Sequence, residues 1–152
     1  VARLEHVRQT IAPALERGKT VICDRYLAST IAYQGAGHGV DPSIIMDLHQ
    51  QFCGLLPDIT IVLDIGPKIG LTRANSRNLA GTSPEHRFED LPVAYHEKVR
   101  QGLLKGAQMT SRTTIVVDAS RSIDEVAAEI ALKLPIAMDD AYALGAAQWS
   151  PR

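Results

Sequence analysis

The sequence predicts a single α/β domain in which helices cover both faces of a parallel β-sheet. Three short runs rich in Val, Ile, Leu and Thr, at residues 20–24, 59–64 and 114–118, have the character of buried strands. They alternate with longer segments whose apolar residues recur at helical spacing. Strands that alternate with helices form parallel sheets covered on both faces. No internal repeat and no linker divides the 152 residues.

Start and stop signals give the order of elements in the first half of the chain. Apolar residues at helical spacing predict a helix over residues 1–17, loosened near its end by Pro13 and stopped at Gly18. After the first strand, a short helix is expected over residues 26–33. Glycines predict a loop over residues 35–39.

The next helices are predicted from caps and breakers. Asp41 as N-cap and Pro42 at the first helical position open a helix that should end before Gly54. Further helices are expected over residues 67–79, 91–109 and 122–134, with a mobile loop at 78–84. The last helix opens with a capping box from Ser122 to Glu125. The predicted domain ends at residue 134, and the tail 135–152 has weak periodicity.

Composition excludes several classes of function. The chain is 45% hydrophobic and 22% charged with a net charge of −1, so it has no bulk field for nucleic acid or a membrane surface. No apolar run is long enough to span a bilayer. Cys23 and Cys53 have neither CxxC nor zinc-site spacing, and we expect a cytoplasmic protein with reduced thiols.

An acid–base pair, Asp24-Arg25, stands where the first predicted strand ends. Open α/β sheets bind ligands at the carboxyl ends of their strands. There Asp24 could orient a metal-bound water, and Arg25 could grip a phosphate with two hydrogen bonds. A local salt bridge that only closes the strand is the plainer interpretation of the dipeptide.

The short helix after this pair carries Ser29, Thr30, Tyr33 and Gln34. Thr30 and Gln34 are four residues apart, so both could reach one edge of a planar base. Tyr33 could lie against a sugar or ring. An ordinary exposed polar face fits the same spacing.

A third set of residues consists of Arg73, Arg77 and Arg87, on the predicted helix 67–79 and the loop after it. Three guanidinium groups around a loop could close over a polyphosphate and balance the charge of phosphoryl transfer. A solvated helix face is the alternative. The sequence contains no GxxxxGK[ST] phosphate loop and no GxGxxG.

Together these motifs resemble bacterial thymidylate kinases over about residues 1–134. Asp24-Arg25-Tyr26 matches the family's DR(Y/H) motif, and residues 29–37 match its S-x-x-A-Y-Q-G-x-G segment. Further matches are R-x-x-H-V and P-A-L at 3–15, GL-PD-T and LD at 54–64, the arginine-bearing lid with its R-F-E exit at 73–89, and DASRSIDEVAAEI at 118–130. His86 stands where the family has Asp before R-F-E.

The resemblance implies a P-loop NTPase-like fold of nucleoside monophosphate kinase type. It implies transfer of the γ-phosphoryl group of ATP to dTMP, giving dTDP, with Mg²⁺, in a homodimer. The thymidylate pocket would consist of Arg3, Ser29, Thr30, Tyr33 and Gln34. Arg25 would hold the acceptor phosphate and Asp24 would support the Mg²⁺–phosphate network. Arg73, Arg77 and Arg87 would clamp the ATP phosphates and the transferring group.

The family's first two strands and its phosphate loop have no counterpart in the sequence. Since the family's sheet order, 2-3-1-4-5, places strand 1 between the strands matched by residues 21–24 and 59–64, we expect both to lose ladder partners on that side and to expose apolar faces. Residues 1–152 alone are therefore expected to be unstable and inactive. Two alternatives stay open: another deoxynucleotide or deoxynucleoside kinase of this fold, and a truncated, non-catalytic nucleotide-binding module.

Overall fold

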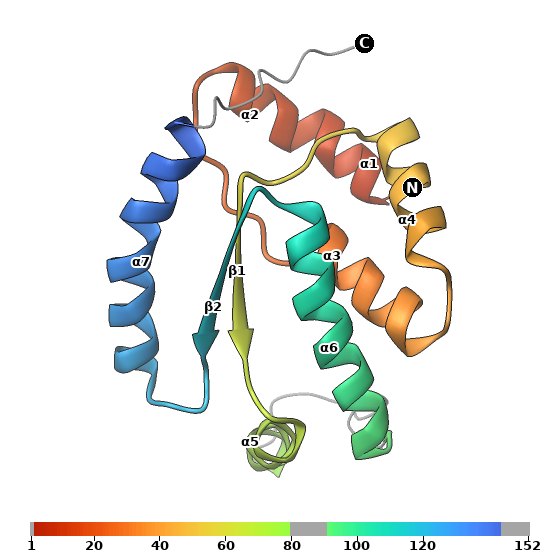
Figure 1. Ribbon diagram of the computed structural model, residues 1–152, viewed down its shortest axis with the longest axis vertical. Coiled ribbons are helices and arrows are strands. Elements are labelled where there is room, and N and C mark those ends of the chain that lie inside the picture. The colour runs from red at the N-terminus through yellow and green to blue at the C-terminus, as the bar shows by residue number, and fades with distance from the viewer. Residues whose placement is uncertain (1, 80–90, 144–152) are drawn as a thin grey trace.

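The computed structural model describes residues 2–79 and 91–143, with side chains at 3–76 and 91–136, and places a strand pair between helices (Figure 1). The elements are α1 (Ala2–His6), the π-helix η1 (Val7–Ile11), α2 (Ala12–Glu16), α3 (Leu27–Thr30), the π-helix η2 (Ile31–Gly37), α4 (Pro42–Phe52), β1 (Ile59–Asp64), α5 (Pro67–Leu79), α6 (Val93–Thr110), β2 (Thr113–Asp118) and α7 (Ile123–Ala143).

The two strands are parallel, as predicted. They are in register from Ile59 opposite Thr113 to Asp64 opposite Asp118, so both end in an aspartate at the same edge. The chain passes from one to the other through α5 and α6. This crossover places the carboxyl ends of the strands beside α5 (Figure 1).

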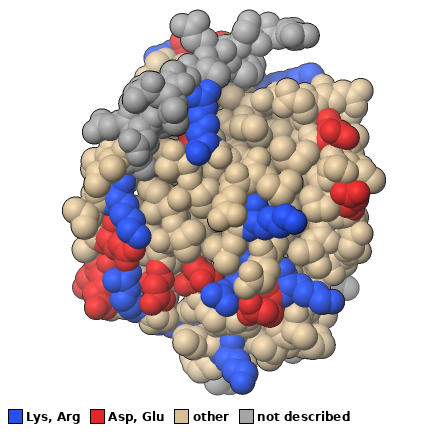
Figure 2. All heavy atoms as spheres, viewed as in Figure 1, with Lys and Arg blue, Asp and Glu red and all other residues tan. Residues whose placement is uncertain are grey.

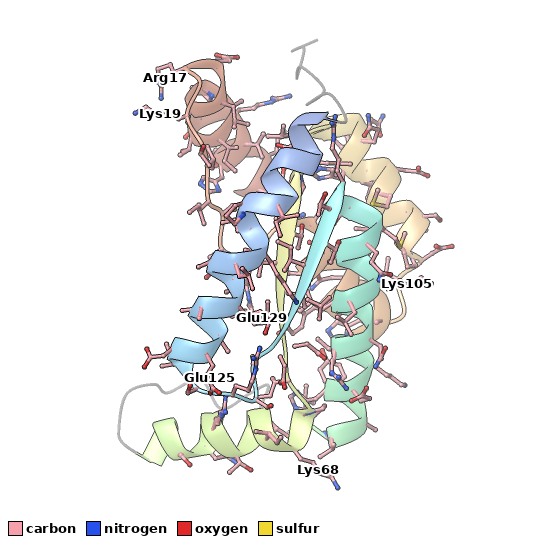
Figure 3. The ribbon with its side chains drawn as sticks, turned by 60° about the vertical axis from the view of Figure 1, so that its left-hand side comes forward. Arg17, Lys19, Lys68, Lys105, Glu125 and Glu129 are labelled. Carbon is pink, nitrogen blue, oxygen red and sulfur yellow. The ribbon has the colours of Figure 1, made fainter. Side chains whose placement is uncertain are left out.

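Helices cover both faces of the strand pair, which confirms the predicted α/β class. On one face, Ile115 and Val117 are buried under α7, whose contact residues are Val126, Ile130 and Leu134. On the other face, Val62 packs against Ala28 of α3 and Ala107 of α6. Figures 1 and 3 show α7 and α6 on opposite sides of the strands.

The predicted strand at residues 20–24 is wrong. The segment has no strand structure, and the sheet of the described residues consists of β1 and β2. An apolar, β-branched run becomes a strand only where a neighbour pairs its backbone N–H and C=O groups. The expected exposure of apolar residues in this segment is observed: Ile22 is 95% exposed.

Two helices near the amino terminus differ from their predicted form. The first is helical over residues 2–16, but its middle turn is π-helical, with Ala12 N–H bonded to Val7 O just before Pro13. Gly18 ends it with a φ of +71°, as expected. The predicted loop at residues 35–39 is also wrong in part, because η2 continues to Gly37. Burial of Gly35 and packing of Gly37 against Tyr95 keep these glycines helical.

Most caps agree with the sequence. Asp41 Oδ1 accepts from Ser43 N at 2.8 Å, and Gly54 ends α4 with a φ of +67°. In the capping box, Glu125 N donates to Ser122 Oγ at 3.3 Å and Ser122 N to Glu125 Oε2 at 3.0 Å.

The predicted end of the last helix is wrong, because α7 runs through Pro135 to Ala143. A proline inside a helix removes one backbone hydrogen bond, and here the helix continues past it. α6 begins at Val93, after Pro92, and not at residue 91. Residues 80–84 of the predicted mobile loop lie outside the described residues.

Charged side chains of both signs are mixed over the face shown in Figure 2, and they gather at the lower left, where α7 begins. There Arg121 and Lys133 both pair with Glu129, the latter at 2.5 Å. Within residues 2–79 and 91–143, no helix is both long and apolar enough to cross a bilayer.

Candidate active site

Arg3 of α1 reaches across to the start of the α3–η2 helix. Its Nη2 donates to Thr30 Oγ1 and, at 3.3 Å, to the backbone oxygen of Tyr26. The guanidinium carbon lies 5.5 Å from the centroid of the Tyr26 ring. The structure thus brings together Arg3 and Thr30, two predicted site residues that are 27 positions apart in the sequence.

Arg25 contacts the same helix one turn further on. Its Nη2 donates to Tyr33 Oη at 3.1 Å, and its guanidinium carbon lies 5.3 Å from the centroid of the Tyr33 ring. Among the described residues there is no Asp24–Arg25 ion pair, so the interpretation of this dipeptide as a local salt bridge is wrong. Asp24 and Arg25 are both exposed.

The backbone at Arg25 is strained. Its φ is +63°, the one positive value that the described part of the chain shows outside glycine. The left-handed region costs an L-residue with a Cβ about 1–2 kcal/mol. Such strain is typical of residues that a ligand site holds in place.

The third residue of the motif, Tyr26, is anchored to the end of α4. Tyr26 Oη donates to Leu55 O at 3.0 Å, and His49 Nε2 donates to the same oxygen at 2.8 Å. The two rings meet edge to face, with centroids 5.6 Å apart. Burial, with smaller contributions from Cys53 and Cys23 that outweigh Arg3, raises the pKa of Tyr26 to about 12.

The sequence did not single out His49 as part of this support. Burial lowers the pKa of His49, and the positive charge of Arg3 acts in the same direction, against the Leu55 hydrogen bond. His49 is buried and contacts Tyr26 from 23 positions away. No local pattern indicated this contact.

The other predicted pocket residues are placed less closely. Ser29 N donates to Tyr26 O at 3.2 Å and closes the first turn of α3. Gln34 is exposed, and its backbone oxygen accepts from Val40 N at 3.0 Å. Because residues 31–37 are π-helical, Thr30 and Gln34 do not have the α-helical spacing on which their expected pairing rested.

The structure places Arg73 against the loop after β2. Its Nη1 donates to Ala119 O at 2.6 Å, and its Nη2 donates to Ser120 O at 2.5 Å. Its described partners are carbonyl oxygens, and none is a residue of the acceptor cluster formed by Arg3, Arg25, Thr30 and Tyr33. The side chain of Arg77 and all of Arg87 lie outside the described residues.

A carboxylate–guanidinium pair at the end of β1 was missed. Arg100 Nε and Nη2 donate to the two oxygens of Asp64 at 2.6 and 2.7 Å, and Nη1 contacts Glu97 at 3.3 Å. The hydrogen bonds that Arg100 donates to Asp64 lower the pKa of Asp64 and raise the pKa of Arg100. The sequence marked Asp64 as a strand end but could not pair it with a residue 36 positions away.

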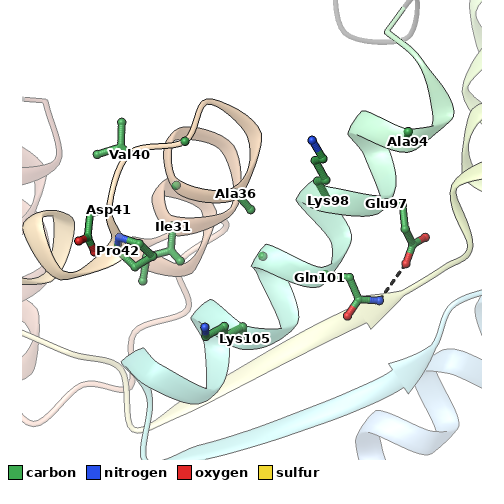
Figure 4. Close-up of a pocket in the computed structure, with 13 residues that line it drawn as sticks. Ile31, Ala36, Val40, Asp41, Pro42, Ala94, Glu97, Lys98, Gln101 and Lys105 are labelled. Carbon is green, nitrogen blue, oxygen red and sulfur yellow. Dashed lines mark hydrogen bonds between the residues drawn. The ribbon is translucent and has the colours of Figure 1, made fainter.

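A cavity of about 670 Å³ lies between η2, residues 39–42 and α6 (Figure 4). Its wall is largely apolar, with Ile31 and Val40 on one side, and Lys98 and Lys105 project from α6. None of the predicted site residues lines it.

Comparison with known proteins gives a consistent result. The thymidylate kinase family model matches residues 1–130. The thymidylate kinase of Cereibacter sphaeroides is 46% identical over 128 residues, 84% of this chain and 59% of that protein. That of Maridesulfovibrio salexigens is 44% identical over 135 residues, 87% of this chain and 62% of that protein.

The fold has a solved counterpart. The crystal structure of thymidylate kinase from Ehrlichia chaffeensis matches with a TM-score of 0.63 and 29% identity, over 88% of this chain and 58% of that one. The predicted fold of nucleoside monophosphate kinase type is confirmed. The chain spans about 60% of the length of these curated relatives. It belongs to the thymidylate kinase family.

Proposed function

We propose that this chain contributes the acceptor site to a kinase that transfers the γ-phosphoryl group of ATP to dTMP and releases dTDP. The proposal rests on one observation: Arg3 bonds to Thr30 while Arg25 bonds to Tyr33 on the same helix. Thr30 and Tyr33 lie three positions apart on the continuous α3–η2 helix. Two guanidinium groups therefore flank one short stretch of surface.

The two arginines would take different parts of the nucleotide. Arg3 and Thr30 offer N–H and O–H donors to the carbonyl edge of thymine. Arg25, with a planar fork of donors, suits the acceptor phosphate. Tyr33, which follows Thr30 on the helix and accepts from Arg25, would face the deoxyribose, with Ser29 and Gln34 as further pocket residues.

Phosphoryl transfer asks the protein mainly for positioning and charge neutralisation. Arg25 would orient the acceptor phosphate, while Arg73, Arg77 and Arg87 would neutralise the phosphates of ATP and the transferring group. Arg73 would exchange its carbonyl partners for phosphate oxygens, since a guanidinium binds an anionic oxygen more strongly than a neutral carbonyl oxygen.

Magnesium fits this site only as an ion shared with the substrate. The described residues contain no group of three His, Cys, Asp or Glu side chains that could hold a metal. Mg²⁺ is commonly held by one or two carboxylates together with substrate phosphates. Asp24 offers one such carboxylate, and the ion would supply charge neutralisation of the phosphates.

A second copy of the chain is the proposed partner, in a cytoplasmic homodimer. Ile44, Leu48 and Phe52 form an apolar stripe at a spacing of four residues along α4, and each is more than half exposed. Such a stripe supports burial against another protein surface. We assign residues 1–134 to the kinase domain and leave the tail 135–152 without a role.

The proposal is tested by a coupled kinase assay on the native protein with ATP, Mg²⁺ and a panel of acceptors. We expect turnover with dTMP and far less with dUMP, dCMP or thymidine. Preference for one of the latter would indicate a related nucleotide or nucleoside kinase. Failure to phosphorylate any of them would contradict the proposal and favour a non-catalytic binding module.

A further inference from the structure

Helix α6 packs on the α3–η2 helix almost backbone to backbone. A Cβ added at Gly102 would lie 2.5 Å from Ala36 Cβ and 3.0 Å from Ala32 Cα. One added at Gly106 would lie 3.1 Å from both Ala28 O and Ile31 Cβ. The 2.5 Å separation at Gly102 is too short for a real Cβ contact, so even a methyl group there would push the two helices apart.

The same pair of helices also meets at the amino-terminal end of α6. A Cβ added at Gly37 would lie 2.9 Å from Tyr95 Oη and 3.2 Å from Tyr95 Cε2. The hydroxyl of Tyr95 is buried there and has no hydrogen-bond partner among the described residues. A buried polar group left unpaired destabilises the folded state. The fold tolerates this cost while Tyr95 is packed tightly against η2.

The acceptor cluster lies on the side of the α3–η2 helix that faces away from α6. Ile31, Ala32 and Gly35 are buried, whereas Thr30 and Tyr33 bond to Arg3 and Arg25. η2 is a π-helix, a form that is rare and depends on its surroundings. Its position relative to the arginines is therefore set by the helix against which it packs.

We propose that Gly102 is a positioning residue for the acceptor site. The absence of a side chain at Gly102 lets η2 approach α6, and this approach fixes where Tyr33 and its partner Arg25 stand. The inference rests on the proposed function, because it concerns the dTMP site. With alanine at this position, the contact to Ala36 must lengthen from 2.5 Å to at least 3.4 Å, the start of ordinary contact. A shift of this size toward the arginines would disturb hydrogen-bonded geometry.

Steady-state kinetics of the native protein test this. Gly102→Ala should raise KM for dTMP at least about tenfold and change KM for ATP less than about twofold. A tenfold change corresponds to about 1.4 kcal/mol. The matched control is Gly70→Ala in α5, where the new Cβ would meet Ile65 Cγ2 at an ordinary 3.5 Å. Both changes replace a helical glycine by alanine, but we expect only the first to change KM for dTMP.

A second substitution separates positioning from general damage. Ala36→Gly removes the atom that a Cβ at Gly102 meets at 2.5 Å and leaves Ala32 Cα at 3.0 Å. The double variant Gly102→Ala/Ala36→Gly should therefore recover most of the lost affinity for dTMP. If Gly102→Ala does not fold, Gly37→Ala probes the same packing against the more adaptable Tyr95 and should show the same selective rise in KM.

The outcomes are distinct. An unchanged KM for dTMP in a folded Gly102→Ala or Gly37→Ala variant overturns the inference while the proposed function stands. An equal rise in both KM values, or no recovery in the double variant, also overturns it. A wild-type protein that does not phosphorylate dTMP overturns the proposed function and this inference together.

Discussion

The chain before β1 and the chain from β1 onward are built differently. Before β1 the backbone contains two π-helices, Arg25 in the left-handed region and an extended segment with an exposed Ile22. From β1 onward it consists of an in-register strand pair and long α-helices. The irregular half holds the acceptor cluster, and the regular half supports it through α6. Backbone irregularity is thus concentrated where ligand contacts are proposed.

The largest expected effect follows from replacing Arg25. Arg25→Ala and Arg25→Gly should each lower kcat/KM for dTMP by at least about 10²–10³-fold, because a charged donor to the phosphate is lost. The glycine variant should nevertheless be more stable than the alanine variant by about 1 kcal/mol, since glycine adopts a positive φ without strain.

The regular half supplies the matched control for this substitution. Ala128→Gly, at an exposed position of α7, should lower the free energy of unfolding by about 1 kcal/mol. Chemical denaturation of the native protein measures all three variants. If glycine at position 25 were less stable than alanine there, the backbone strain at Arg25 would not be real.

The next effect tests the ion pair that ties α6 to β1. Arg100→Leu removes both hydrogen bonds to Asp64 and leaves this half-buried carboxylate near Asp118. We expect a loss of about 1–2 kcal/mol in the free energy of unfolding, as for a partly buried charged pair. No measurable loss would show that the Asp64 pair is no stronger than an exposed surface contact.

The smallest effect is a pH dependence in the irregular half. The folded-state pKa of His49 lies below its ordinary value, about 6.5, chiefly because of burial. As pH falls below that value, the unfolded chain binds a proton that the folded chain does not, so the free energy of unfolding falls. His49→Phe retains an aromatic ring against Tyr26 but does not titrate.

The decrease in stability between pH 7.5 and 5.5 should therefore be smaller in His49→Phe than in the wild type. Thermal or chemical unfolding at the two pH values measures this difference. Identical decreases in both proteins would show that His49 does not contribute to the pH dependence.

The same contrast explains what the sequence could predict. α4 and the Ser122–Glu125 capping box depend on residues close in sequence, and β1 finds its neighbour in β2; all three were predicted correctly. The segment 20–24 reads as a strand locally, but strand formation depends on a neighbour that the sequence pattern does not supply. The π-helical form of η2 depends on packing against α6, a helix about 65 positions away in the sequence. No pattern of residues at α-helical spacing indicates this form.

The residues of the candidate site show the same division between local patterns and long-range contacts. The motif residues Arg3, Arg25, Thr30 and Tyr33 were identified by resemblance, and the structure brings them together in pairs. The supporting residues His49, Arg100 and Gly102 act through contacts to distant positions, which no local spacing reveals. Their roles become visible only from distances in the folded chain.

The most direct test of the account is a crystal structure of the native protein with dTMP. The account predicts the phosphate within hydrogen-bond distance of the Arg25 guanidinium and the thymine edge beside Arg3 and Thr30. Occupancy of the cavity between η2 and α6, with Arg3 still bonded to Thr30 and Arg25 to Tyr33 and no nucleotide near them, would contradict it.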